Sequence, residues 1–178
     1  MTRSVLVHEW WIRFTWDLAT VPEAESELPE HYQIAPSLRE DEKELRRVIA
    51  SSFTLDPTWN PDMQEAMQTI ETWLDRASET ETTTFLALRH GTRIIGAAVV
   101  SVDPSAENHL APGPCILMEY RNRGFGTRLL ERSLSTLRVA GLTEASAIAK
   151  ESSPATKFLY SKFASTAAPY ETPSAVAA

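Results

Sequence analysis

The chain has 178 residues, 43% of them hydrophobic and 23% charged, which suits one globular domain with its own hydrophobic core. A formal net charge of −7 disfavours nucleic acid and anionic lipid as partners, and a lone cysteine, Cys115, excludes an intrachain disulfide. No apolar run approaches the ~20 residues that span a bilayer, and His8, Glu9, Arg13 and Asp17 interrupt any secretory signal. We therefore expect a cytoplasmic protein without a membrane partner.

The N-terminal segment alternates between two faces. Apolar side chains occupy every second position of the chain and so share one face, namely Trp10, Ile12, Phe14, Trp16 and Leu18. This period of two predicts a strand, and the acidic segment from Pro22 to Pro29 predicts a loop. We assign residues 1–30 to an N-terminal extension and expect its strand to pack against its own domain. An added sheet edge, a cover over an acceptor site and a homodimer contact are the other readings.

Two helices are predicted after a short strand over 31–35. Ser37 to Glu40 has the spacing of a capping box, and the helix behind it carries an apolar stripe. A second helix is expected from Asn60–Pro61, because proline is favoured at the first helical position. The stripes are Leu45, Val48, Ile49 and Phe53 in the first helix, and Met63, Met67, Ile70, Leu74 and Ala77 in the second.

The rest of the chain alternates strands with helices. Residues 83–88 and 93–102 flank a short glycine-containing link and predict an antiparallel hairpin, whose second strand is apolar on both faces and therefore central. A strand over 115–118, a helix ending near Gly141, a strand over 145–149 and a helix opening at Ser153–Pro154 follow. This order indicates an α/β fold with a mixed, mostly antiparallel sheet flanked by helices. We place the domain at 31–168 and a flexible tail at 169–178.

The strongest chemical signal is a glycine-containing loop between the strand at 115–118 and the next helix. The loop reads Arg121-Asn122-Arg123-Gly124-Phe125-Gly126-Thr127. A helix N-terminus has unpaired N–H groups and the positive end of a dipole, and glycines allow close approach of a phosphate. The loop lacks the lysine of a Walker loop and the three-glycine spacing of dinucleotide-binding proteins. An ordinary tight turn is the alternative on spacing alone.

Two segments resemble the GNAT acyltransferase superfamily. Met118 to Gly126 is similar to the family's coenzyme A loop. The pattern of that loop is Arg or Gln, then any two residues, Gly, any one residue, and Gly or Ala. Ser153 to Phe163 resembles its second motif, a helix with a tyrosine near the cofactor sulfur. The chain departs from that pattern at Ser153, usually asparagine, at Thr156, usually alanine, and at Ala164–Ser165, usually Gly-Phe. The resemblance implies a GNAT-like fold and acetyl-coenzyme A as cofactor.

The resemblance also implies residue roles. The backbone of Ile116, Leu117 and Met118 would pair with the pantetheine arm, and an N–H of that strand would stabilise the oxyanion. The N–H groups from Arg121 to Thr127 would hold the pyrophosphate, with Arg121, Arg123 and Arg128 adding positive charge. Ser153 would contact the pantetheine. Tyr160 would donate a proton to the departing thiolate.

The attacking amine must lose a proton, and two candidate bases flank the predicted cofactor strand. Glu119 follows the strand and His109 precedes it, and either would act through water. Cys115 is expected to be a small core residue, and the histidines show no metal-ligand spacing. Three functions stay open: an N-acetyltransferase acting on an amine, a non-catalytic acyl-coenzyme A sensor, and a nucleotide-binding regulator.

Overall fold

The computed structural model describes residues 10–22, 27–54 and 63–171. Its first sheet has four strands in the order β2 (Tyr32–Pro36), β3 (Thr83–His90), β4 (Arg93–Ser101) and β5 (Cys115–Ile116). Its second sheet has three strands in the order β6 (Glu144–Lys150), β1 (Trp11–Asp17) and β7 (Thr166–Tyr170). All strand pairs in both sheets are antiparallel, which confirms the predicted fold class.

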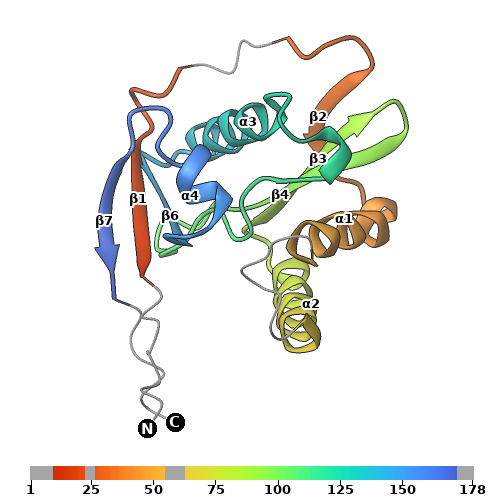
Figure 1. Ribbon diagram of the computed structural model, residues 1–178. Helices are drawn as coiled ribbons and strands as arrows, with labels where there is room; N and C mark the ends of the chain where they lie inside the picture. The colour runs from red at the N-terminus through yellow and green to blue at the C-terminus, as the bar shows by residue number, and fades with distance from the viewer. Residues whose placement is uncertain (1–9, 23–26, 55–62, 172–178) are drawn as a thin grey trace, which may run out of the picture.

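Helices cover both faces of the four-stranded sheet (Figure 1). On one face lie α1 (Glu42–Thr54), which packs on β4 and β5, and α2 (Met63–Glu79), which packs on α1. On the other face lies α3 (Phe125–Val139). The short α4 (Pro154–Phe158) contacts β6. The 3-10 turns η1 (Arg39–Asp41) and η3 (Met118–Tyr120) precede α1 and the glycine loop.

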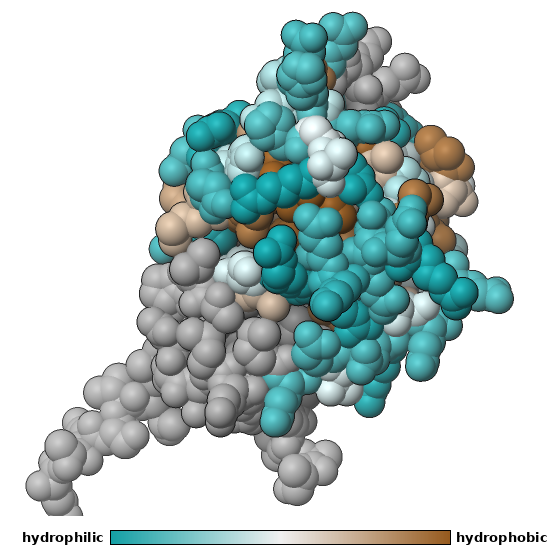
Figure 2. All heavy atoms as spheres, turned by 90° about the vertical axis from the view of Figure 1, so that its right-hand side faces the viewer, coloured by the Kyte–Doolittle hydropathy of each residue, from teal (hydrophilic) through white to brown (hydrophobic). Residues whose placement is uncertain are grey.

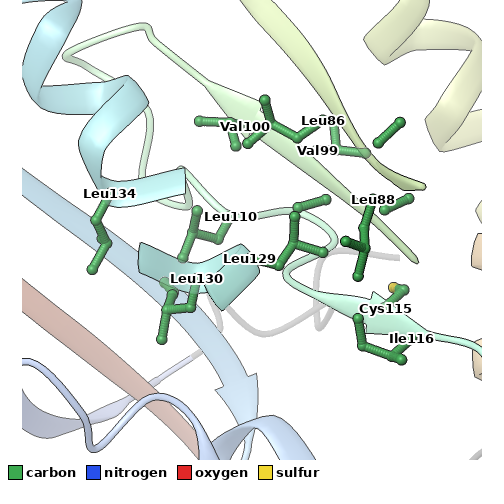
Figure 3. Close-up of a cluster of buried hydrophobic side chains, with 14 of the residues drawn as sticks. Leu86, Leu88, Val99, Val100, Leu110, Cys115, Ile116, Leu129, Leu130 and Leu134 are labelled. Atoms are coloured by element: carbon green, nitrogen blue, oxygen red, sulfur yellow. The ribbon is translucent and has the colours of Figure 1, made fainter. Parts of the chain in front are cut away.

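The predicted stripes form the core where their side chains are described. Leucines 129, 130, 134 and 137 of α3 are all fully buried, and Figure 3 shows Leu129, Leu130 and Leu134 in one cluster with side chains of β3 and β4. Cys115 and Ile116 lie at one end of this cluster (Figure 3). Leu45, Val48, Ile49 and Leu74 are buried on the α1 and α2 side. The apolar period of these helices thus points them at the sheet, as predicted.

Two local predictions need correction: the cap at Ser37, and the burial of Phe158 on the helix that opens at Ser153–Pro154. The turn before α1 is capped at Leu38 rather than Ser37, because the Asp41 carboxylate accepts the Leu38 N–H at 2.8 Å. Phe158, expected on the buried stripe of α4, is 68% exposed. The predicted helix start at Asn60–Pro61 lies outside the described residues.

The N-terminal strand is the centre of the second sheet. Every residue of β1 pairs with β6 on one side, and Trp11 to Thr15 also pair with β7 on the other. Phe14 is 4% exposed and Trp16 is fully buried. The strand is therefore not a sheet edge, and it packs within its own domain, as predicted. Pro169 and Tyr170, which we assigned to the tail, lie in β7.

The two sheets meet at one short segment and separate beyond it. The Ser101 N–H donates to the His109 carbonyl at 2.9 Å, and the His109 N–H donates to the Ser146 carbonyl at 2.7 Å. Further along, β5 pairs only with β4, and β6 pairs only with β1. Residues after α4 lie in the resulting opening, since Tyr160 contacts both Phe14 of β1 and Gly113 just before β5.

We expect deletion of residues 1–20 to lower the melting temperature strongly or abolish soluble expression. The deletion removes the central strand and its buried Phe14 and Trp16, and loss of one such aromatic side chain alone costs about 3–5 kcal/mol. Thermal unfolding measured by circular dichroism checks this. Deletion of residues 1–9, which leaves β1 in place, is the control. An unchanged melting temperature after the longer deletion would contradict the structural role of β1.

Candidate active site

The loop after β5 turns sharply before α3 begins. Asn122 has φ 62° and Gly124 has φ 81°, both left-handed, and Gly124 is the N-cap of α3. Asparagine tolerates this conformation better than most residues, and glycine adopts it freely. A Cβ built on Gly124 would meet nothing within 4 Å. The loop backbone at Gly124 therefore faces open space.

The backbone N–H groups of this loop are unsatisfied within the described part of the chain. The first bond of α3 runs from the Arg128 N–H to the Gly124 carbonyl at 3.2 Å, and no N–H from Asn122 to Thr127 donates to a described residue. Arg121, included in the predicted set, donates its N–H to the Met118 carbonyl at 3.1 Å. The remaining run of free donors at the positive end of a helix dipole fits a phosphate group.

Of the three arginines predicted to add positive charge here, Arg121 is engaged elsewhere, and a lysine that was not predicted lies beside these amides. The Arg121 guanidinium donates to the carbonyls of Ile116 at 3.0 Å and Ser52 at 3.4 Å, so it ties β5 to α1. From the turn after α4, the Lys162 Nζ donates to the Thr127 hydroxyl at 2.9 Å, in the first turn of α3. No described carboxylate forms an ion pair with Lys162. Sequence reasoning missed Lys162, because nothing in the chain places residue 162 beside residue 127.

Gly126 is needed for helix packing. A Cβ built there would lie 3.3 Å from a Leu159 methyl group, closer than an ordinary van der Waals contact. Glycine at this position lets the segment that carries Tyr160 approach the first turn of α3. The two loop glycines therefore serve different purposes: Gly124 allows the turn and Gly126 allows the close contact.

The strand β5 offers one edge to the opening. The Leu117 N–H donates to the Ile95 carbonyl at 2.9 Å, so it belongs to the ladder with β4. In an antiparallel ladder the next residue points its N–H the other way, so the Ile116 N–H faces away from β4. Met118 lies in the 3-10 turn and is 53% exposed. Among the three residues predicted to contact the pantetheine, Ile116 is therefore the one whose strand N–H is not used in the ladder with β4.

Tyr160 lies buried in the opening between the sheets. Its ring packs edge-on against Phe14 and Trp16, with centroid distances of 5.5 Å and 5.7 Å. Its hydroxyl abuts Gly113, where a Cβ would come within 1.9 Å of the hydroxyl oxygen. Burial, with a smaller contribution from Cys115, raises the pKa of Tyr160. No hydrogen bond joins this hydroxyl to another described residue.

Cys115 is a poor nucleophile. Its side chain is buried, and burial raises the pKa of the thiol to about 12. A neutral thiol at neutral pH disfavours a covalent acyl-cysteine route.

The two candidate bases differ in their environment. Glu119 is half exposed and its carboxylate accepts from Arg93 Nη2 at 2.9 Å. Its own backbone N–H and then Arg93 lower the pKa of Glu119. His109 is buried, with Nδ1 accepting the Ser146 N–H at 3.0 Å and Nε2 lying 3.0 Å from the Asp103 carbonyl oxygen. Both ring nitrogens of His109 thus hold the sheet junction, and neither is free for an amine proton.

Glu119 lines a hollow on the side of the molecule where α1 lies. The hollow has a volume of about 240 Å³, and Figure 2 shows that this side is largely hydrophilic with a small hydrophobic area. The residues around the hollow are Arg47, Ser51, Arg93, Leu117, Met118 and Glu119. Leu117 and Met118 belong to the segment that follows Ile116, so the hollow adjoins the predicted cofactor strand.

Ser153 begins α4. Its hydroxyl oxygen accepts the Thr156 N–H at 3.2 Å and lies 3.0 Å from the Thr156 hydroxyl oxygen, while proline follows it at the first helical position. This is the N-cap that the sequence predicts. The Thr156 hydroxyl in turn donates to the Lys150 carbonyl at 2.7 Å, which fixes the start of α4 to the end of β6.

The described ranges offer neither a metal site nor a membrane-spanning helix. No group of histidine, cysteine, aspartate and glutamate there could hold a metal ion. None of the described helices is long and apolar enough to cross a membrane.

Comparison with known families decides the assignment. The family model described as "Acetyltransferase (GNAT) family" matches residues 35–164, well over half of the chain. The chain belongs to the GNAT acetyltransferase family. Members of this family use acetyl-coenzyme A as acetyl donor and amines as acceptors. No curated protein sequence matches the chain.

Solved structures share the GNAT fold. A GCN5-related N-acetyltransferase from Sphaerobacter thermophilus is 18% identical, with a TM-score of 0.63 over 90% of this chain and 49% of that one. A functionally unknown conserved protein from Staphylococcus epidermidis is 13% identical, with a TM-score of 0.62 over 90% and 58%. A putative GNAT acetyltransferase from Novosphingobium aromaticivorans is 18% identical, with a TM-score of 0.58 over 90% and 60%. This chain thus spans between 49% and 60% of the length of these three structures.

Proposed function

We propose that this GNAT protein is an N-acetyltransferase that moves an acetyl group from acetyl-coenzyme A directly to an amine bound in the same complex. The observation that carries the proposal is the run of free N–H groups from Asn122 to Thr127, beside which the segment of Tyr160 places Leu159 and Lys162. The residues present fit the cofactor, because the open space at Gly124 and the charge of Lys162 both suit a diphosphate.

Each residue of the site has one task in this proposal. Bound acetyl-coenzyme A supplies a thioester whose acetyl group passes to the amine nitrogen, leaving coenzyme A as a thiol. The free Ile116 N–H donates to the acetyl oxygen as negative charge develops there. The Tyr160 hydroxyl gives its proton to the sulfur as the carbon–sulfur bond breaks. Ser153, as the N-cap, keeps α4 in place beside the pantetheine.

The proton of the amine leaves through Glu119 and water. Glu119 lines the hollow beside Leu117 and Met118, and its carboxylate is ionised because its own backbone N–H and Arg93 lower its pKa. A low pKa makes a weak base, so water relays the proton from the amine to the carboxylate and on to solvent. Exchange of Glu119 for glutamine is therefore expected to lower activity only a few-fold.

Release of coenzyme A thiol with a panel of amines tests the proposal. The panel contains a polyamine, amino acids, an aminoglycoside and a peptide with a free N-terminus. Binding of acetyl-coenzyme A and of ATP is measured beside it by calorimetry. Turnover with at least one amine supports an enzyme. Tight binding without turnover on any amine would instead support an acyl-coenzyme A sensor, and preference for ATP would support a nucleotide-binding regulator.

Lys162→Met is expected to raise the KM for acetyl-coenzyme A roughly tenfold with little change in kcat. The substitution removes a charge-assisted hydrogen bond to phosphate, worth about 1.5 kcal/mol. Lys157→Met, in the exposed last turn of α4, is the matched control and leaves the KM unchanged. Steady-state kinetics check both variants. Equal KM values for Lys162→Met and the native protein would show that Lys162 does not contact the phosphate.

A further inference from the structure

The segment that carries Tyr160 cannot hold itself in place. Helix α4 has five residues, far fewer than an isolated helix needs in water, and Tyr160 follows its end. The next turn contains two non-glycine residues with left-handed backbone, Phe163 at φ 60° and Ala164 at φ 56°. Such residues persist only where surrounding contacts hold them. The position of the Tyr160 hydroxyl therefore depends on contacts from outside the segment.

The strand β1 supplies two of these contacts through Trp16. The indole N–H of Trp16 donates to the Lys162 carbonyl at 2.8 Å, across 146 positions of sequence. The Trp16 ring also meets the Tyr160 ring edge-on at 85°, and Trp16 is fully buried. One side chain of β1 thus holds both the backbone of the turn and the ring of the tyrosine.

Opposite Trp16, the Tyr160 hydroxyl meets the chain just before β5. Because a Cβ at Gly113 would overlap the hydroxyl, a small displacement of the Tyr160 ring changes where its proton points. Mispositioning a catalytic group by about 1 Å can lower a rate roughly 100-fold. The Trp16 ring meets the Tyr160 ring edge-on at a centroid distance of 5.7 Å, so it limits displacement of the Tyr160 ring.

We propose that Trp16, on the N-terminal strand, is a positioning residue that aims the Tyr160 hydroxyl at the sulfur of the bound thioester. The inference rests on the proposed role of Tyr160 as the acid. It assigns the N-terminal strand to the catalytic machinery, although β1 precedes the stretch that matches the family model.

A double-mutant cycle with Trp16→Phe and Tyr160→Phe tests the proposal. Trp16→Phe keeps an aromatic ring but removes the indole N–H that bonds to Lys162. We expect it to lower kcat roughly tenfold, with the KM for acetyl-coenzyme A changed less than about twofold. In the Tyr160→Phe background the same exchange should change kcat by less than about twofold, because the group it aims is already gone. Turnover is followed with the best amine of the panel, or with water as acceptor.

Leu137→Ala is the control for lost stability. Leu137 is fully buried in α3, about 18 Å along the helix axis from its first residue, and its exchange should lower the melting temperature without lowering kcat. An unchanged kcat in Trp16→Phe would overturn the positioning role, and so would an equal loss in both backgrounds. Native kcat in Tyr160→Phe alone would instead refute the proposed acid and leave cofactor binding unaffected.

Discussion

Replacement of Tyr160 by phenylalanine is expected to lower kcat about 100-fold or more, while the KM for acetyl-coenzyme A changes less than about twofold. Loss of a positioned general acid typically costs 10²–10⁴ in rate. The loss follows from the proposed role of Tyr160, because without its hydroxyl the departing thiolate forms without a proton donor. Phenylalanine keeps the packing against Phe14 and Trp16, so cofactor affinity is retained. Steady-state kinetics separate the two parameters.

The pH dependence of the native protein gives a second check on Tyr160. Burial raises its pKa above the usual value of about 10, so the proton-carrying form persists as pH rises through that value. We expect no fall in kcat between pH 7 and about 10 that is caused by Tyr160. Tyr120→Phe is the control, because the Tyr120 hydroxyl bonds instead to His90 Nδ1 at 2.9 Å. A fall in kcat below pH 10 that disappears in Tyr160→Phe would contradict this account.

Replacement of Gly124 by valine is expected to weaken binding of acetyl-coenzyme A about 10- to 100-fold. A β-branched residue at φ 81° is strained by roughly 1–2 kcal/mol or more, and relief of that strain moves the free N–H groups at the start of α3. Isothermal titration calorimetry measures the dissociation constant.

Gly141→Val is the matched control for this substitution. Gly141 also has a positive φ, 98°, and a Cβ there also meets nothing within 4 Å, but it lies at the other end of α3. The two variants should lose similar stability, and only Gly124→Val should lose affinity. Equal affinity in both variants would show that the loop does not hold the cofactor.

Local patterns were enough to predict most elements and the cofactor loop. The leucine stripe of α3, the alternating Ala145 and Ala147 of β6, and the Ser153–Pro154 start of α4 each depend on nearby residues only. The glycine loop was found for the same reason, since a strand, a turn with glycine and a helix lie consecutively in the chain.

Features that depend on contacts between distant residues were not predicted. The sequence of β1 shows a strand, but its place between β6 and β7 depends on segments more than a hundred residues away. The strand β7 was missed because its TAAPY sequence lacks the apolar alternation of a buried strand and is largely exposed. Arg121 was expected at the phosphate and Lys162 was overlooked, because the direction of a long side chain follows from tertiary contacts.

The most direct test of the account is the response of the loop amides to the cofactor. Backbone amide hydrogen exchange and ¹⁵N chemical shifts of Asn122 to Thr127 are recorded by NMR before and after addition of coenzyme A. The account predicts slowed exchange and large shifts throughout this run, with Gly141 and its neighbours unaffected. Unchanged exchange and shifts from Asn122 to Thr127 at saturating coenzyme A would contradict it.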